Sequence, residues 1–242
     1  MFGQKWGDMN QEHPGLTKAK RLVKQLLGRD MWIWPQVRVK TDFLGGHYGG
    51  YAVFPERLNR GSVIYSVGLG ENISFDLALI ERYGSTIFAC DPTPKSVAWL
   101  RQQNLPEQFK FRAIGLAAYD GVADFASPRL ARNVSFSMAR HASDQETGVT
   151  AEVACLATLM RQNGHDHLDI LKMDVEGAEY DILENVMASH CSIGQIILEF
   201  HPEMVPHGLQ RTKEILKKLY QFGYRIYAIS ADGRDFSLMH TR

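Results

Sequence analysis

Cysteine is scarce in this sequence, and the cysteines present are not spaced for a metal site. Cys90, Cys155 and Cys191 lie far apart, and no C-x-x-C pair occurs. The runs around Cys90 and Cys155 are apolar, so these two residues are predicted to be thiols of the core. The scarcity argues against a disulfide-rich secreted domain and against a zinc-binding module. We therefore expect a reducing, cytoplasmic environment.

Long apolar stretches and an excess of charge are also missing. The apolar runs fall well short of the roughly 20 residues that cross a bilayer. Residues 1–15 lack the apolar centre of a signal peptide. We therefore expect no membrane span. Lys plus Arg number 27, as do Asp plus Glu, so the overall charge predicts no nucleic-acid partner.

Positive charge is nevertheless concentrated at the start of the sequence. Residues 1–40 carry eight Lys or Arg against three Asp or Glu. Within them, residues 16–28 (LTKAKRLVKQLLG) have the pattern of a basic amphipathic helix, with apolar side chains mainly on one side. Such a helix can make peripheral contact with a membrane surface. We favour instead the packing of its apolar side on the main domain, with Lys and Arg facing water.

Residues 62–91 are the stretch that predicts a ligand. An apolar, β-branched run over 63–67 is typical of a strand buried on both faces, and Gly68-Leu69-Gly70 ends it. A helical pattern follows, and a second apolar run ends on Asp91, about 20 residues on. This is the first half of a nucleotide-binding βαβ unit, in which a glycine turn approaches the ligand and a carboxylate accepts from ribose hydroxyls. A buried βαβ unit without a ligand also uses glycine in its turns.

Helical and strand patterns alternate through the rest of the sequence. The further runs that predict parallel strands are 86–90, 109–116, 169–173 and 195–200. The runs 224–229 and 236–240 flank Asp232-Gly233 and predict a closing antiparallel hairpin. The order predicts an α/β fold with a doubly wound, mostly parallel sheet and an antiparallel C-terminal hairpin.

The sequence divides into two parts near residue 60. Residues 1–60 are assigned to an extension made of the basic helix and a Gly/Tyr-rich loop, and residues 61–242 to the main domain. Within that domain, Asp120-Gly121 separates the runs 113–118 and 122–125 and predicts a second hairpin. Residues 127–150 predict an inserted loop on the ligand face. A solvated loop is the simpler interpretation of its basic side chains than recognition of a phosphate or acidic sugar; these are Arg129, Arg132, Arg140 and His141.

Two residues argue against a dinucleotide ligand. Ile73 replaces the third glycine of the dinucleotide fingerprint, and Glu71 stands where a helix N-terminus would receive the pyrophosphate. A carboxylate there repels phosphate, and the absence of G-K-[ST] excludes a P-loop. An adenosine ligand without phosphate, bearing a cationic sulfur and an amino-acid tail, fits better, and this is S-adenosylmethionine. A nicotinamide-dependent oxidoreductase is the alternative enzyme class.

A segment far from the glycine turn carries a family resemblance. Residues 170–183, ILKMDVEGAEYDIL, resemble the signature of the FkbM family of S-adenosylmethionine-dependent methyltransferases, and the resemblance extends from about Ser62 to Phe200. It implies the Rossmann-like class I methyltransferase fold, a seven-stranded sheet whose last strand is antiparallel. It also implies S-adenosylmethionine as the cofactor. The implied reaction is methyl transfer to a hydroxyl oxygen of a sugar or secondary metabolite, so the expected acceptor is a small molecule or saccharide.

The resemblance further implies which residues surround the cofactor. Gly68 and Gly70 would let the backbone approach its amino-acid tail, and Asp91 would accept from both ribose hydroxyls. Thr93 would lie beside the ribose or adenine. The full set of expected cofactor-binding residues is Ser66, Gly68, Gly70, Glu71, Asp91, Thr93, Ile114, Gly115 and Asp174.

The same resemblance places three other members of this set at two further strand ends. Ile114 and Gly115 would border the adenine edge, and Asp174 would lie next to the methyl group.

Two positions depart from the family pattern. Many class I enzymes carry an acidic residue two positions before the first glycine, where this sequence has Ser66, and the next motif glycine is Asn72. Ser66 can form a hydrogen bond but cannot pair with the ammonium group of the cofactor, and Glu71 could supply that charge instead. These departures keep open the alternative of a catalytically silent S-adenosylmethionine-binding module.

Methyl transfer to an alcohol requires a base within hydrogen-bond reach, or a metal that lowers the pKa of the hydroxyl. The candidates at strand ends on the ligand face are Asp174, Glu176, Glu179, Glu199 and His201. His201 is the better base by its unperturbed pKa, whereas Asp174 is better placed by the resemblance. Asp174, His201 and Glu176 are therefore the predicted catalytic residues.

Each candidate also has a purely structural interpretation. Glu176 and Glu179 could be carboxylates that the dipole favours in the first turn of a helix. Glu199 and His201 could form a structural hydrogen-bonded pair. Asp174, Glu176 and Glu199 could together bind a hard cation, although we assign no metal site.

Overall fold

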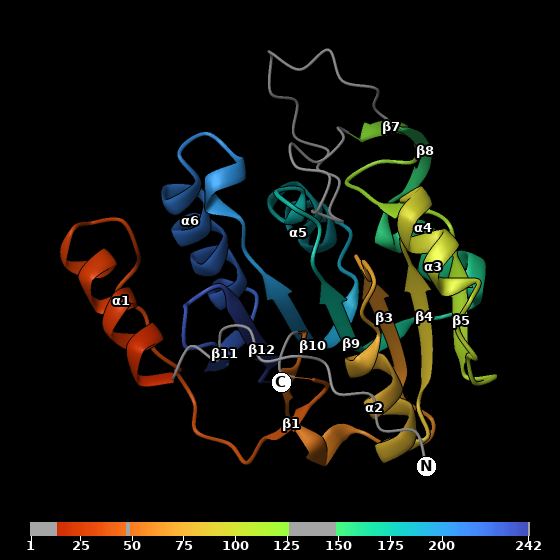
Figure 1. Ribbon diagram of the computed structural model, residues 1–242, viewed down its shortest axis with the longest axis horizontal. Helices are drawn as coiled ribbons and strands as arrows, with labels where there is room; N and C mark the ends of the chain where they lie inside the picture. The colour runs from red at the N-terminus through yellow and green to blue at the C-terminus, as the bar shows by residue number, and fades with distance from the viewer. Residues whose placement is uncertain (1–13, 47–48, 126–148, 242) are drawn as a thin grey trace.

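The computed structural model describes residues 14–46, 49–125 and 149–241. Its centre is a seven-stranded sheet with the strand order β11-β12-β10-β9-β3-β4-β5 (Figure 1). The strands are β3 (Val63–Val67), β4 (Thr86–Cys90), β5 (Phe109–Arg112), β9 (His167–Met173), β10 (Ser192–Glu199), β11 (Tyr224–Ile229) and β12 (Asp235–His240). Strands β5, β4, β3, β9 and β10 pair in parallel, and β12 is antiparallel to both of its neighbours. The predicted class I methyltransferase fold, with its antiparallel C-terminal hairpin, is confirmed.

Helices cover both faces of this sheet. The helices are α1 (Pro14–Leu26), α2 (Ser74–Tyr83), α3 (Pro94–Leu100), α4 (Leu156–Asn163), α5 (Glu179–Ala188) and α6 (Gly208–Gln221), with short 3-10 turns η1 (Pro55–Arg57) and η2 (Pro202–Met204). Alternate residues of each strand point to opposite faces. Tyr65 and Val67 belong to a core that includes residues of α4, α5 and α6, whereas Ile64 packs in a second core with residues of α2. Burial on both faces explains why the strands are nearly continuous apolar runs.

The segment before β3 forms a small hairpin of its own. Strands β1 (Asp42–Leu44) and β2 (Tyr51–Val53) pair antiparallel. Tyr51 and Val53 are buried in the same core as α2. The side chain of Gln195 on β10 accepts from the Phe54 amide (2.8 Å) and donates to the Phe54 carbonyl (3.0 Å). The Gly/Tyr-rich segment is therefore attached to the main sheet through apolar packing and a buried amide.

A second, three-stranded sheet corrects one prediction. The expected hairpin of 113–118 with 122–125 is wrong, because β8 (Val149–Ala154) lies between β6 (Gly115–Leu116) and β7 (Gly121–Phe125). Strand β6 pairs parallel with β8, and β7 pairs antiparallel with it. Asp120 does not close a hairpin turn but accepts from the Cys155 amide (2.8 Å) and the Thr158 hydroxyl (2.7 Å) at the start of α4. A pairing with a strand this distant in the sequence leaves no local signal.

Helix α1 corrects a second prediction. We expected its apolar side to pack on the main domain, and this is wrong: Leu16, Leu22, Val23, Leu26 and Leu27 are all exposed. Its half-buried side chains are polar and include Arg21, whose guanidinium lies against Gly233 in the β11–β12 turn. Within the described residues, no helix has the length and apolar character that crossing a bilayer requires.

Candidate active site

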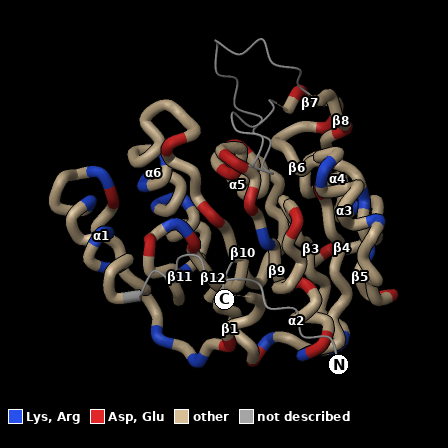
Figure 2. Tube along the Cα trace, viewed as in Figure 1, with Lys and Arg blue, Asp and Glu red and all other residues tan. Residues whose placement is uncertain are grey.

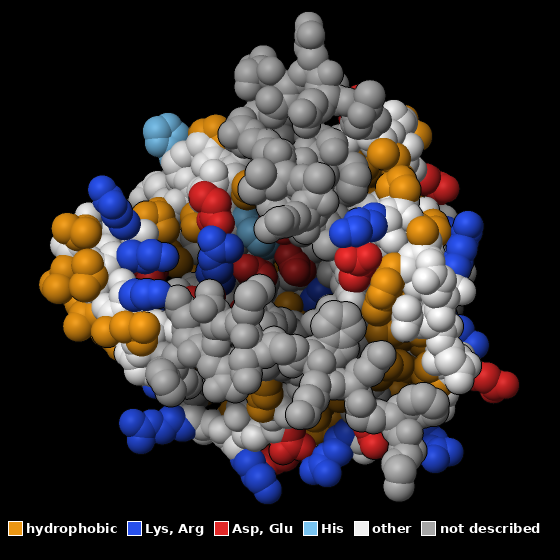
Figure 3. All heavy atoms as spheres, viewed as in Figure 1, with side chains coloured by type: hydrophobic (Ala, Val, Ile, Leu, Met, Phe, Trp, Pro, Cys, Tyr) orange, Lys and Arg blue, Asp and Glu red, His pale blue; other side chains and the backbone are white. Residues whose placement is uncertain are grey.

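A cleft opens at the carboxyl edge of the sheet, where β3, β4 and β9 end. The turns after these strands meet there because parallel strands end at the same edge. The lining residues are Val67, Gly68, Leu69, Gly70, Asp91, Pro92, Thr93, Ser96, Gly115, Leu116, Phe125, Asp174, Val175, Glu176 and Ala178. On the face shown in Figure 3, acidic side chains gather with a histidine in a hollow near the centre.

The glycine turn after β3 is constrained at its first residue. Gly68 has a φ of 72°, and a Cβ on it would lie 1.6 Å from the carbonyl oxygen of Asp174. Only glycine tolerates both the left-handed conformation and this approach. Lys172 on β9 donates to the carbonyls of Gly68 (2.6 Å) and Val67 (3.3 Å). The turn is thus anchored to the neighbouring strand through side-chain and backbone contacts.

Asp91 anchors the same turn from the other side. Its carboxylate is buried, and one oxygen accepts from the amides of Leu69 (2.9 Å) and Gly70 (3.1 Å). The other oxygen accepts from the amide (2.9 Å) and the hydroxyl (2.7 Å) of Thr93. A carboxylate has about four lone-pair sites, so these four bonds use its capacity. Asp91 therefore orders the turn whether or not a ribose is present.

The structure brings most, but not all, of the expected cofactor residues to the cleft. The residues that line it are Gly68, Gly70, Asp91, Thr93, Gly115 and Asp174. Ser66 is fully buried within β3, and Ile114 belongs to the core that includes α4 and α5; neither lines the cleft. Glu71 does not line it either, and its carboxylate lies 3.0 Å from Nζ of Lys95. Glu71 is thus already paired with a cation of the chain.

A buried polar cluster near the glycine turn was not predicted from the sequence. Asp76 on α2 is buried, and burial raises the pKa of its carboxyl, while Lys172 and Ser66 act in the opposite direction. These residues lie on the sheet face that carries α2, where the sequence pattern predicts apolar side chains. A charged residue inside an apolar strand, such as Lys172 in ILKMD, is the signal that could have revealed the cluster.

Other lining residues had no chemical signature in the sequence. Pro92 and Ser96 flank Thr93, and Leu116, Phe125 and Val175 supply apolar surface. Such side chains can contact an adenine ring without a recognisable motif. The expected basic residues Arg129, Arg132, Arg140 and His141 lie outside the described residues.

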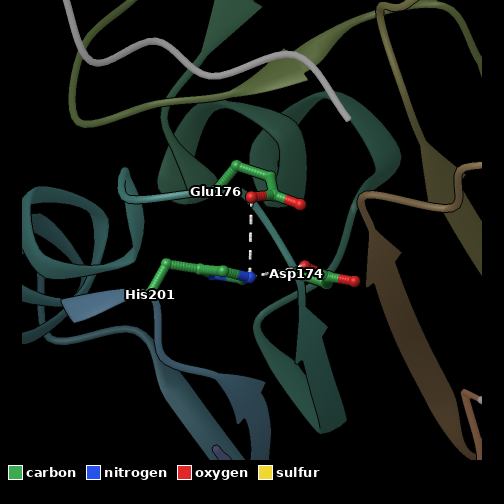
Figure 4. Close-up of side chains that lie close together, drawn as sticks. All are labelled: Asp174, Glu176 and His201. Atoms are coloured by element: carbon green, nitrogen blue, oxygen red, sulfur yellow. Dashed lines mark ion pairs between the residues drawn. The ribbon is translucent and has the colours of Figure 1, made fainter. Parts of the chain in front are cut away.

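The five candidate acid–base residues converge on one cluster next to the cleft. Figure 4 shows Asp174, at the end of β9, and Glu176, in the following turn, pointing toward His201 beyond β10. Nε2 of His201 lies 3.7 Å from Asp174, 3.6 Å from Glu176 and 3.6 Å from Glu199. Glu176 has a φ of 50°, a left-handed conformation that is uncommon for a residue with a side chain. Backbone strain of this kind is concentrated at functional sites.

Glu179 fixes the position of His201 through its buried carboxylate. Its buried carboxylate accepts from the amides of His201 (2.6 Å) and Gly177 (2.7 Å), and lies 3.4 Å from Nδ1 of the His201 ring. Both contacts fix the loop that carries Glu176 relative to the end of β10. Glu179 is thus a positioning residue, and it does not line the cleft.

Electrostatics give His201 a charge that the sequence did not suggest. Burial disfavours its protonated form, but the carboxylates of Glu179, Glu176 and Asp174 outweigh burial and raise the pKa of His201 to about 9. The ring is therefore protonated at neutral pH, and neither of its nitrogens can accept a proton. Burial and the nearby Asp174 raise the pKa of Glu199, which also lies 3.3 Å from Arg234. The proton-accepting groups of the cluster are its carboxylates.

Three of these residues also have the arrangement of a cation site. Asp174, Glu176 and His201 each offer one ligand atom, and the three atoms lie within 4.8 Å of one another. Two carboxylates and an imidazole suit a divalent transition metal. The set differs from the three carboxylates considered from the sequence, because His201 takes the place of Glu199.

Much of the chain is similar to known proteins. Residues 59–226 match the family model described as the methyltransferase FkbM domain. Two curated relatives are named probable methyltransferase-like protein 24: the rat protein is 24% identical over 74% of this chain, and the human protein 26% identical over 70%. The matches cover 42% and 43% of those two proteins, so the chain spans less than half of their length.

Solved structures give a more distant similarity. The N-terminal domain of human METTL16 in complex with SAH is 11% identical, with a TM-score of 0.42, over 96% of this chain and 83% of that chain. The family match, in contrast, covers the glycine turn, the cleft and the whole carboxylate–histidine cluster. The chain therefore belongs to the FkbM methyltransferase family, and its cofactor is S-adenosylmethionine.

Proposed function

We propose that this chain methylates a hydroxyl oxygen of a small acceptor, a sugar or a secondary metabolite, with Asp174 as the proton acceptor. When bound, S-adenosylmethionine supplies an electrophilic methyl group on a sulfonium. The acceptor oxygen forms the new bond to carbon as the bond to sulfur breaks, and its proton passes to a carboxylate. The observation that carries the proposal is the position of Asp174, which belongs both to the cleft lining and to the cluster.

Within this proposal, the glycine turn holds the cofactor. The backbone at Gly68 and Gly70 would approach the amino-acid tail, and Asp91 and Thr93 would meet the ribose. Because Asp91 already accepts four hydrogen bonds, a ribose hydroxyl must share or replace one of them. Gly115, with Leu116 and Phe125, would border the adenine.

The cluster favours oxygen over nitrogen as the acceptor atom. Asp174, Glu176 and Glu199 surround Nε2 of His201 within 3.7 Å. Carboxylates this close raise the pKa of an amine and keep it protonated, without the lone pair that attacks the methyl group. A neutral hydroxyl has no such penalty, and a carboxylate can take its proton. His201, protonated, would orient Asp174 and Glu176 rather than act as the base.

A panel assay tests the proposal. The chain is incubated with S-adenosylmethionine and a set of hydroxylated sugars and metabolites, with matched amino analogues. Release of S-adenosylhomocysteine and the mass of the product are followed. We expect methylated product from at least one hydroxyl acceptor. Turnover only with the amino analogues would overturn oxygen methylation.

A catalytically silent cofactor-binding module is the second candidate. Its support is that Ser66 is buried away from the cleft and that Glu71 is paired with Lys95, so neither offers a charge to the cofactor's ammonium group. Tight binding of S-adenosylmethionine in calorimetry, together with no turnover on the whole panel, would favour this candidate. The cytoplasmic location and the lack of a nucleic-acid partner stay predictions.

A further inference from the structure

Helix α1 presents an apolar stripe to solvent. Val23 and Leu26 are 54% and 71% exposed, and Leu16, Leu22 and Leu27 are exposed as well. At about 100° per residue, these side chains fall on one side of the helix. Figure 3 shows apolar side chains at the left edge of the molecule, where Figure 1 places α1, with Lys and Arg beside them. An amphipathic helix normally buries this side.

The helix is held in this orientation by its polar side. Arg21 is 14% exposed and pairs with Asp30 at 3.2 Å, and its guanidinium lies against Gly233. Gln25, one turn further on, donates to the Met31 carbonyl at 2.7 Å. Both contacts lie on the side opposite the apolar stripe. Within the described residues, the exposure of the stripe is therefore a property of how α1 is anchored.

Two exposed tryptophans follow α1 in the sequence. Trp32 and Trp34 are 52% and 64% exposed, and their ring centroids lie 6.1 Å apart. Tryptophan is enriched where a protein meets the interface between lipid and water, because its ring is apolar and its N–H is polar. Two neighbouring exposed tryptophans, like an exposed apolar stripe, are unusual on a surface that faces only water.

Positive charge borders the stripe on both sides. Residues 14–40 contain seven Lys or Arg and one acidic residue, Asp30, which pairs with Arg21. At the helical spacing, Lys24 lies along one border of the stripe and Lys18 along the other, and both are exposed. The tube in Figure 2 shows this concentration of Lys and Arg along α1. Such a charge suits an anionic partner.

We propose that α1, together with Trp32 and Trp34, docks this chain on the surface of an anionic lipid bilayer. The apolar stripe would enter the headgroup region while the flanking lysines meet acidic headgroups, which is how basic amphipathic helices bind membranes. A second copy of the chain is a poorer occupant, because two surfaces of the same positive charge would face each other. The proposal does not rest on the methyl-transfer proposal.

Vesicle sedimentation tests the docking surface. The chain is mixed with phosphatidylcholine vesicles, with and without phosphatidylserine, and the bound fraction is measured after centrifugation. We expect binding only where phosphatidylserine is present. The double variant V23Q/L26Q should bind at least about 10-fold more weakly, because two apolar side chains no longer enter the headgroup region. Glutamine keeps the helix propensity of leucine nearly unchanged.

Matched variants separate this surface from general effects. L77Q/V122Q removes one exposed leucine and one exposed valine elsewhere on the surface, and should bind like the unmodified chain. K18Q/K24Q should bind about 30-fold more weakly, since each of the two lysines near an acidic surface contributes about 1 kcal/mol. K213Q/K217Q, on exposed positions of α6, should not. Circular dichroism checks that each variant keeps its helix content.

Three results would overturn the proposal. The first is no binding to phosphatidylserine vesicles, and the second is equal loss in V23Q/L26Q and L77Q/V122Q. The third comes from light scattering in the absence of lipid. A dimer that V23Q/L26Q dissociates would show that a second copy covers the stripe.

Discussion

The glycine turn and the carboxylate–histidine cluster lie side by side at the same edge of the sheet, yet their carboxylates differ in how fully they are hydrogen-bonded. Both carboxylate oxygens of Asp91 accept short hydrogen bonds from Leu69, Gly70 and Thr93. In the cluster, the ring nitrogens of His201 lie 3.4–3.7 Å from the carboxylates, farther than in such bonds. The turn is a rigid frame, whereas the cluster holds charge that a reacting group can use. The predictions below test this contrast.

The largest effect is expected from Gly68→Ala. Its Cβ would lie 1.6 Å from the Asp174 carbonyl, and the backbone at φ 72° disfavours any side chain. We expect a loss of more than about 4 kcal/mol in the free energy of unfolding, measured by urea denaturation. Gly164→Ala is the control, because Gly164 has a φ of 73° with no atom within 4 Å of the added Cβ. It should lose only about 1 kcal/mol, and equal losses would contradict a special role for the turn.

Asp174→Asn should slow turnover with little change in cofactor binding. Asparagine keeps the shape of the side chain but cannot take a proton, so kcat should fall about 100-fold. The rate of S-adenosylhomocysteine release measures this. Asp181→Asn, an exposed carboxylate paired with Arg211, is the control and should keep the original rate. An unchanged kcat in Asp174→Asn would place the base elsewhere.

Asp91→Ala should instead weaken cofactor binding by disturbing the glycine turn. It leaves the amides of Leu69 and Gly70 without their acceptor and removes the expected ribose contact. We expect the dissociation constant of S-adenosylmethionine in calorimetry to rise by about 10- to 100-fold, the equivalent of about 1–3 kcal/mol. An unchanged affinity would mean that the cofactor does not contact this part of the cleft.

Because of His201, the free energy of unfolding should depend on pH. The pKa of His201 is raised to about 9 from its ordinary 6.5, so its contribution is fully present below about pH 6.5 and is lost as the pH rises through about 9. The free energy of unfolding should fall by about 2 kcal/mol between pH 7 and pH 9. Urea denaturation in the presence of a chelator measures this. His201→Gln should flatten the profile in this range, and an unchanged slope would contradict the assigned charge.

The positions of strands and helices could be predicted from the sequence better than the roles of the site residues, and the reasons are physical. Strand and helix positions follow from local periodicity, and the glycines that end α2 and α4, Gly84 and Gly164, are left-handed as expected of helix ends. The pairing of β7 with β8 depends on contacts far apart in the sequence, so no local pattern encodes it. The exposure of Leu and Val on α1 could not be predicted either. An amphipathic pattern shows that a helix has an apolar and a polar side, but it does not show which side packs against the rest of the chain.

The charge of His201 could not be predicted from the sequence either. The unperturbed pKa of histidine favoured His201 as the base, but three carboxylates of the segment from Asp174 to Glu179, which the fold brings against His201 beyond β10, raise its pKa to about 9. Asp76 and Lys172 likewise come close together only once α2 packs with β3 and β9 in the second core. Residue types could be predicted as candidates, whereas their roles depend on which neighbours the fold supplies.

The most direct test compares Asp91→Ala and Asp174→Asn in a single measurement of S-adenosylmethionine affinity by calorimetry. We expect Asp91→Ala to raise the dissociation constant by about 10-fold or more, and Asp174→Asn to change it by less than about 2-fold. Equal weakening by both variants, or weakening by Asp174→Asn alone, would contradict the division between a binding frame and a reactive cluster.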